Sequence, residues 1–105
     1  MRPTVTLKNM REIHIDCSDV SSTEEFWQRY VDTVEPRDSG LFGRNLDAFW
    51  DAVEGGGPGY PGEVSLVFMN SAHLSGLKTR NGVAFLDALK TIADETSVGN
   101  IKFLY

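Results

Sequence analysis

Cysteine is almost absent from this sequence, and Cys17 is the only one among its 105 residues. The chain therefore cannot form an internal disulfide, which suits a protein of a reducing compartment. The first ten residues also lack an apolar run long enough for the core of a signal peptide. We therefore expect a cytoplasmic protein in which residues 1–10 form a flexible tail, because they show no clear hydrophobic period.

Long hydrophobic runs and an excess of positive charge are missing as well. No segment approaches the ~20 apolar residues that a membrane-spanning helix needs. The chain carries 10 basic and 15 acidic residues, and its formal net charge of -5 repels the phosphates of nucleic acids. We therefore expect neither a membrane nor a nucleic acid as partner, whereas the charge favours a basic protein.

The apolar residues recur with periods that predict alternating strands and helices in one small domain, residues 11–105. The predicted elements are strands at 11–18, 64–69 and 101–105, helices at 22–34, 45–55 and 83–95, and a short helical turn between 70 and 82. The run at 64–69 is mostly apolar, as expected of a strand covered on both faces. Strands separated by helices favour parallel pairing, so the predicted fold is α/β, with a three-stranded parallel sheet and flanking helices.

Local signals mark the ends of the predicted helices. Ser21 or Ser22 can cap the first helix, and two glutamates follow three residues later, which is the spacing of a capping box. Pro36 disfavours helical structure in the residue before it and ends that helix. Asn45 is a good cap for the second helix, which a cluster of glycines ends.

The second predicted helix carries an apolar face beside an acidic one. At about 100° per residue, Asp47, Asp51 and Glu54 fall on one stripe. The neighbouring apolar wedge, which should face the core, consists of Leu46, Phe49, Trp50 and Val53. On the remaining side of the helix, Ala48 and Ala52 provide only small side chains.

The acidic stripe has two interpretations that the sequence leaves open. Like charges one turn apart repel by about 0.2–0.5 kcal/mol per pair, and no Lys or Arg occurs from residue 45 to residue 63. The stripe is either a solvated helix face or an anionic surface that binds cations of a partner. Carboxylates one turn apart also suit a metal ion, but no histidine is near them in sequence, so we expect no metal or cofactor.

His14 and Cys17 raise the separate possibility of a cysteine nucleophile with a histidine base. The two residues are an odd number of positions apart on an expected strand, so their side chains should point to opposite faces. We therefore expect Cys17 to be a packed thiol near a strand end and assign no catalytic residue.

The segment FGRNLDAFWDAV, residues 42–53, resembles the signature of the barstar family of ribonuclease inhibitors. In that family an aromatic residue, a glycine and a variable residue precede Asn-Leu-Asp-Ala-Leu/Phe-Trp-Asp, and here the run ends at Asp51. The pairs Tyr60–Pro61 and Asn81–Gly82 also fall where the family has them, so the resemblance covers residues 11–105. It implies an α/β fold with three parallel strands, and inhibition of a small, cationic, secreted microbial ribonuclease, of the guanyl-specific kind.

The resemblance also implies how such an inhibitor binds. The aspartate that matches Asp51 occupies the place of the substrate phosphate, and the one that matches Asp47 adds charged contacts. The glycine at Gly43 allows close backbone approach to the enzyme, and Asn45 shapes the loop. The implied ribonuclease-binding residues are Leu41, Phe42, Gly43, Arg44, Asn45, Asp47, Trp50, Asp51, Glu54, Gly55 and Gly56. The complex should be one-to-one, with a monomeric inhibitor that is not an enzyme.

Three positions depart from the family pattern. Leu41 stands where the family often has a second aromatic residue, so a stacking ring is either lost or supplied by Phe42. A Gly-Pro-Gly stretch around Pro58 replaces an aromatic residue after the helix. Ile92 stands where the family has an acid, unless one of the two acids that end that helix substitutes for it. These differences affect the choice of target more than the mode of binding.

Two other functions remain possible at this point. One is an adaptor or antitoxin that keeps the fold but binds a different basic protein. The other is a small enzyme that uses its carboxylates or Cys17.

Overall fold

The computed structural model of the chain describes residues 11–96 and 100–105. The expected flexible tail, residues 1–10, lies outside the described residues. The elements are β1 (Arg11–Asp16), α2 (Thr23–Val34), η1 (Ser39–Leu41), α3 (Leu46–Gly55), β2 (Val64–Met69), η2 (Ser71–Leu74), α4 (Phe85–Glu95) and β3 (Ile101–Phe103). The short 3-10 helix η1 was not expected from the sequence, whereas η2 confirms the predicted helical turn.

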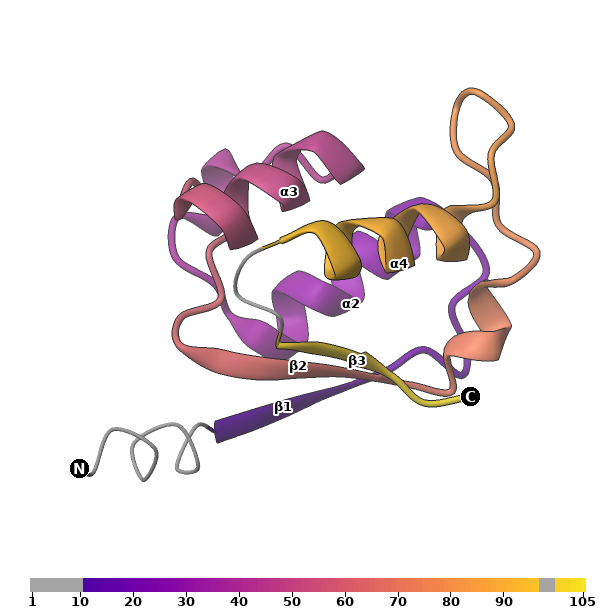
Figure 1. Ribbon diagram of the computed structural model, residues 1–105, viewed down its shortest axis with the longest axis horizontal. Coiled ribbons are helices and arrows are strands. Elements are labelled where there is room, and N and C mark those ends of the chain that lie inside the picture. Colours follow the sequence, from indigo (N-terminus) through magenta and orange to yellow (C-terminus); the bar gives the residue numbers. More distant parts are fainter. Residues whose placement is uncertain (1–10, 97–99) are drawn as a thin grey trace.

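The three strands form one parallel sheet in the order β1-β2-β3, which confirms the predicted α/β fold. In the register of the sheet, Ile13 lies opposite Leu66, and Phe68 lies opposite Phe103. Helices α2, α3 and α4 lie on the same side of this sheet (Figure 1). The core therefore lies between the sheet and these helices, and α3 is held at one edge of it.

On the other side of the sheet the described residues place polar and charged side chains and no helix (Figure 1). Val67 is buried there, with His14 and Lys102 as its register partners on β1 and β3. Glu12 lies 3.3 Å from the His14 imidazole and 3.6 Å from the Lys102 ammonium. The apolar run of β2 thus has cover on both faces, but long polar side chains provide the second cover.

The first helix begins and ends at the residues that its local signals predict. Ser22 accepts a hydrogen bond from the Glu25 backbone N–H at 3.1 Å, and the Glu25 carboxylate accepts two from Ser21, each at 2.8 Å. These bonds satisfy backbone donors that the first turn leaves free. At the other end Glu35 adopts a left-handed conformation immediately before Pro36.

Helix α4 begins two residues later than predicted, because Val83 and Ala84 belong to a hairpin. Lys78 forms an isolated antiparallel bridge with Ala84, and the Thr79 N–H donates to the Val83 carbonyl at 2.7 Å. These backbone bonds hold residues 83–84 in extended geometry. The hydrophobic period of the helix therefore includes two residues that are not helical.

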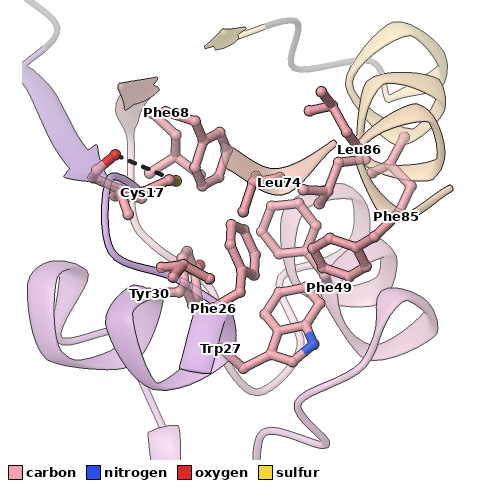
Figure 2. Close-up of a cluster of buried hydrophobic side chains, with 14 of the residues drawn as sticks. Cys17, Phe26, Trp27, Tyr30, Phe49, Phe68, Leu74, Phe85 and Leu86 are labelled. Atoms are coloured by element: carbon pink, nitrogen blue, oxygen red, sulfur yellow. Dashed lines mark hydrogen bonds between the residues drawn. The ribbon is translucent and has the colours of Figure 1, made fainter. Parts of the chain in front are cut away.

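Aromatic rings fill the centre of the core and join the helices to one another (Figure 2). Trp27 of α2 lies edge-on to Phe26 at 4.8 Å and contacts the rings of Phe42, Phe49 and Phe85 at 5.5–5.8 Å between centroids. Such pairs contribute about 0.5–1.5 kcal/mol each beyond their buried area. Trp27 is a core residue, and its ring contacts join α2 to α3 and α4.

Candidate functional site

Helix α3 is fixed at both ends by bonds that the sequence predicts. The Asn45 side-chain oxygen accepts from the Ala48 N–H at 2.7 Å, and its amide donates to the Gly43 carbonyl at 3.3 Å. Gly56, at φ 76°, ends the helix and donates its N–H to the Ala52 carbonyl at 3.1 Å. A short helix capped at both ends holds its side chains in fixed positions.

The buried face of α3 contains the apolar wedge that the sequence predicts and extends beyond it to Ala52. Phe49, Ala52 and Val53 are buried, whereas Leu46 and Trp50 are only half-buried. All four residues of the predicted wedge thus belong to the core or pack against it, which confirms the wedge, whereas the burial of Ala52 was not expected. Trp50 lies at the margin between core and surface.

The three acids of α3 project on the exposed side of the helix. Asp47, Asp51 and Glu54 are all exposed. In the described residues, 11–96 and 100–105, no lysine or arginine forms an ion pair with Asp47 or Asp51. The nearest basic residue in sequence, Arg44, donates instead to the Gln28 side chain at 2.7 Å. Asp47 and Asp51, called here the acid pair, therefore repel each other, and no ion pair with a described residue offsets that repulsion.

The loop before α3 presents one exposed apolar side chain and buries another. Leu41 is 75% exposed at the end of η1, where its N–H donates to the Asp38 carbonyl at 2.8 Å. Phe42 is 5% exposed, with its ring 5.6 Å from Trp27 and 5.7 Å from Tyr30. Its ring is therefore not available for stacking on a partner. The exposed apolar side chain of this loop is therefore the aliphatic Leu41, at the position where the resemblance suggested a second aromatic ring.

The glycine-rich stretch after α3 supports this loop, a role that sequence reasoning missed. A Cβ atom on Gly59 would lie 2.5 Å from a ring carbon of Phe42, and Gly59 has φ of 95°. The Tyr30 hydroxyl donates to the Gly59 carbonyl at 2.7 Å, and the Gly59 N–H donates to the Arg37 carbonyl at 2.8 Å. Gly-Pro-Gly in sequence indicates only a turn. The contact with Phe42 comes from the tertiary fold.

Gly43 and Arg44 form the tight entry to α3. A Cβ atom on Gly43 would lie 3.2 Å from the Cβ atom of Ala48, so the glycine has a packing role in the free protein. Arg44 has φ of 54°, a left-handed conformation that is unfavourable for a residue with a side chain. Gly55 and Gly56 lie at the far end of the helix, where Gly55 is exposed and Gly56 is half-buried.

The other candidate groups do not form a site with α3. Ile92 is buried in the core, so α4 presents no acid there, and the exposed Asp94 and Glu95 lie at the end of that helix. His14 is exposed, whereas Cys17 is fully buried (Figure 2), where desolvation raises the pKa of its thiol to about 11. A thiol of this kind is a poor nucleophile at neutral pH.

The described residues contain neither a metal-binding cluster nor a membrane-spanning helix. Within residues 11–96 and 100–105, no three side chains of His, Cys, Asp or Glu gather as metal ligands. In the same part of the chain, no helix has the length and apolar character that crossing a membrane requires.

The sequence matches one known family over nearly its whole length. A family model described as Barstar (barnase inhibitor) matches residues 10–105. No curated protein matches the chain.

Proposed function

The chain belongs to the barstar family, and we propose on that premise that it inhibits a small, cationic, secreted ribonuclease in the cytoplasm of the cell that produces the enzyme. The family is one of barnase-type inhibitors, so the proposal concerns this chain's own target and mode of binding. The complex is one-to-one, and the inhibitor itself performs no catalysis.

The exposed acid pair is the observation that carries this proposal. Asp47 and Asp51 project from a helix capped at both ends, and no cation of the described chain neutralises either of them. A ribonuclease must hold several cationic groups around the scissile phosphate. A carboxylate delivered there on a rigid helix binds the same groups through charge-assisted bonds and offers no bond to cleave.

The surrounding residues have distinct roles in the proposed complex. Asp51 takes the place of the substrate phosphate, and Asp47 binds cations at the side of the same site. Gly43 and Asn45 allow the entry loop to lie close to the enzyme, and Leu41 makes an apolar contact at the rim. The remaining contacts at the edge of this surface come from Arg44, Trp50, Glu54, Gly55 and Gly56, with Phe42 contributing only through its backbone.

A second candidate function is an adaptor or antitoxin that binds a different basic protein. Leu41 favours it, because an exposed aliphatic side chain cannot stack on a histidine or arginine plane as an aromatic ring does. A catalytic function has less support, because the buried Cys17 has a raised pKa and lies apart from His14.

Titration of RNA cleavage tests the proposal. A panel of small guanyl-specific ribonucleases is assayed with increasing amounts of the wild-type protein, of Asp51→Ala and of Glu63→Ala, which removes an exposed acid outside α3. Inhibition complete at one equivalent, lost in Asp51→Ala and kept in Glu63→Ala, is the expected result. Tight binding of a basic protein without any effect on RNA cleavage would favour the adaptor instead.

A further inference from the structure

A groove of about 950 Å³ adjoins the proposed binding face, and the proposed function assigns no role to its far wall, the segment 78–83. It is lined by the starts of α2, α3 and α4 and by the hairpin of residues 78–83. Asp47 of the acid pair and Arg44 belong to this lining. A protein that binds Asp47 therefore also lies next to the groove.

The hairpin is held rigidly by its own hydrogen bonds. The Thr79 N–H and the Val83 carbonyl are 2.7 Å apart, and the Val83 N–H donates to the Thr79 hydroxyl at 3.1 Å. Gly82, at φ 81°, completes the turn, and the Phe85 N–H donates to the Leu77 carbonyl at 2.9 Å. In Figure 1 this hairpin projects beyond the start of α4. A surface ordered before binding loses little entropy when a partner docks.

The charges on the hairpin are opposite in sign to those of the acid pair. Lys78 and Arg80 are exposed and line the groove. Neither forms an ion pair within residues 11–96 and 100–105. The two acids in the lining are Asp47 and Glu24. Two cations placed next to a face that binds a cationic enzyme would repel that enzyme, unless it carries an acid opposite them.

We propose that this groove receives a surface loop of the same ribonuclease, and that Lys78 and Arg80 bind a carboxylate on that loop. This inference rests on the proposed function. The acid pair binds the cationic site that such enzymes must share. The hairpin binds well only when the enzyme carries an acidic group opposite Lys78 and Arg80, at the rim of its active site. The two contacts together select one enzyme from others with similar active sites, since an enzyme with a basic residue at that place is repelled.

A double charge reversal, Lys78→Glu with Arg80→Glu, tests this contact. The direction in which it changes the inhibition distinguishes the contact from the effect of net charge. The matched control is Arg11→Glu with Lys102→Glu, which changes the net charge equally at exposed positions of β1 and β3. Added negative charge alone should strengthen attraction to a cationic enzyme in both variants. The proposed contact predicts roughly tenfold weaker inhibition by the hairpin variant, and unchanged or tighter inhibition by the control.

The experiment uses each panel ribonuclease that the wild-type protein inhibits, with thermal unfolding to verify that both variants fold. The neutral variant Lys78→Gln with Arg80→Gln should fall between the wild type and the reversal. Equal or tighter inhibition by the hairpin reversal would overturn the inference and leave the proposed function intact. Failure of the wild-type protein to inhibit any panel enzyme would overturn both.

Discussion

Glu12, on the side of the sheet that faces away from the helices (the open face), and the acid pair on α3 are all exposed carboxylates, but of these three only Glu12 forms ion pairs within the described residues. Glu12 on β1 has two basic neighbours, with the His14 imidazole at 3.3 Å and the Lys102 ammonium at 3.6 Å. The acid pair, Asp47 and Asp51, has no such neighbour among the described residues. The described part of the chain therefore provides ion-pair partners for an acid on one surface and none for the acid pair on another. Charge without internal compensation on a rigid helix is what a surface for a cationic partner requires.

The largest effect that this comparison predicts concerns binding. Asp51→Ala should weaken the complex with the target ribonuclease by about 3 kcal/mol, roughly a hundredfold or more, because it leaves buried cations of the enzyme unpaired. Glu12→Ala, on the open face of the sheet, should change the affinity by less than about 0.5 kcal/mol. Isothermal titration calorimetry of both variants measures the two values, and similar losses would remove the distinction between the surfaces.

The next effect concerns the support beneath the proposed binding face. Gly59→Ala should lower the free energy of unfolding by about 2 kcal/mol, because the new methyl group meets the Phe42 ring and φ is positive. Gly62→Ala is the matched control, since Gly62 has φ of 94° but no atom within 4 Å of the added Cβ. It should cost about 1 kcal/mol. Urea unfolding measures both, and equal costs would show that the Phe42 contact is unimportant.

A smaller effect separates stability from binding. Neutralising Asp51 with Asp51→Asn should stabilise the free protein by about 0.3 kcal/mol, because it removes the repulsion from Asp47. Glu12→Gln should instead destabilise it by up to about 0.5 kcal/mol, since its ion pairs are exposed. Chemical denaturation at low salt gives both signs. Loss of stability in Asp51→Asn would mean that the free protein does compensate this acid.

The smallest effect appears in acid, at Asp16 on the last residue of β1. Hydrogen bonds from Asn70 and Ser18, with the nearby Arg29 charge, hold the pKa of Asp16 below its ordinary value of 3.8. A lowered folded-state pKa stabilises the protein above that ordinary value, and the stability is lost as pH falls through the folded-state pKa. In Asp16→Asn the free energy of unfolding should therefore fall less steeply than in the wild type as the pH is lowered from about 5. Denaturation curves recorded across this pH range measure how the free energy of unfolding depends on pH. The same dependence in the variant and the wild type would contradict a role for Asp16.

The elements that the sequence predicts well are those fixed by neighbours in the chain. The Ser22 cap, the Asn45 cap and the left-handed Gly56 each depend on hydrogen bonds within a few residues, so spacing alone reveals them. The exposure of the acid pair likewise follows from the helical period. These local features place most of the proposed binding face before any tertiary contact is known.

The features that the sequence does not predict depend on contacts between distant segments. Phe42 is buried because Trp27, Tyr30 and Gly59 enclose it, and no spacing rule connects these residues. The burial of Ala52 depends on how α3 packs against the core, and the groove beside Asp47 depends on the hairpin at 78–83, which lies next to the starts of α2 and α3. The match to the barstar family supplied the functional hypothesis, whereas these contacts determine which side chains remain available to a partner.

Competition with substrate tests most directly whether Asp51 occupies the phosphate site of a ribonuclease. A short oligonucleotide that the enzyme binds but cannot cleave is titrated into the preformed complex, and displacement of the inhibitor is followed by fluorescence anisotropy. Mutually exclusive binding is the predicted result, with an apparent inhibitor affinity that falls in proportion to the oligonucleotide concentration. A stable ternary complex of enzyme, oligonucleotide and inhibitor would contradict the account, because the carboxylate and the phosphate cannot share one site.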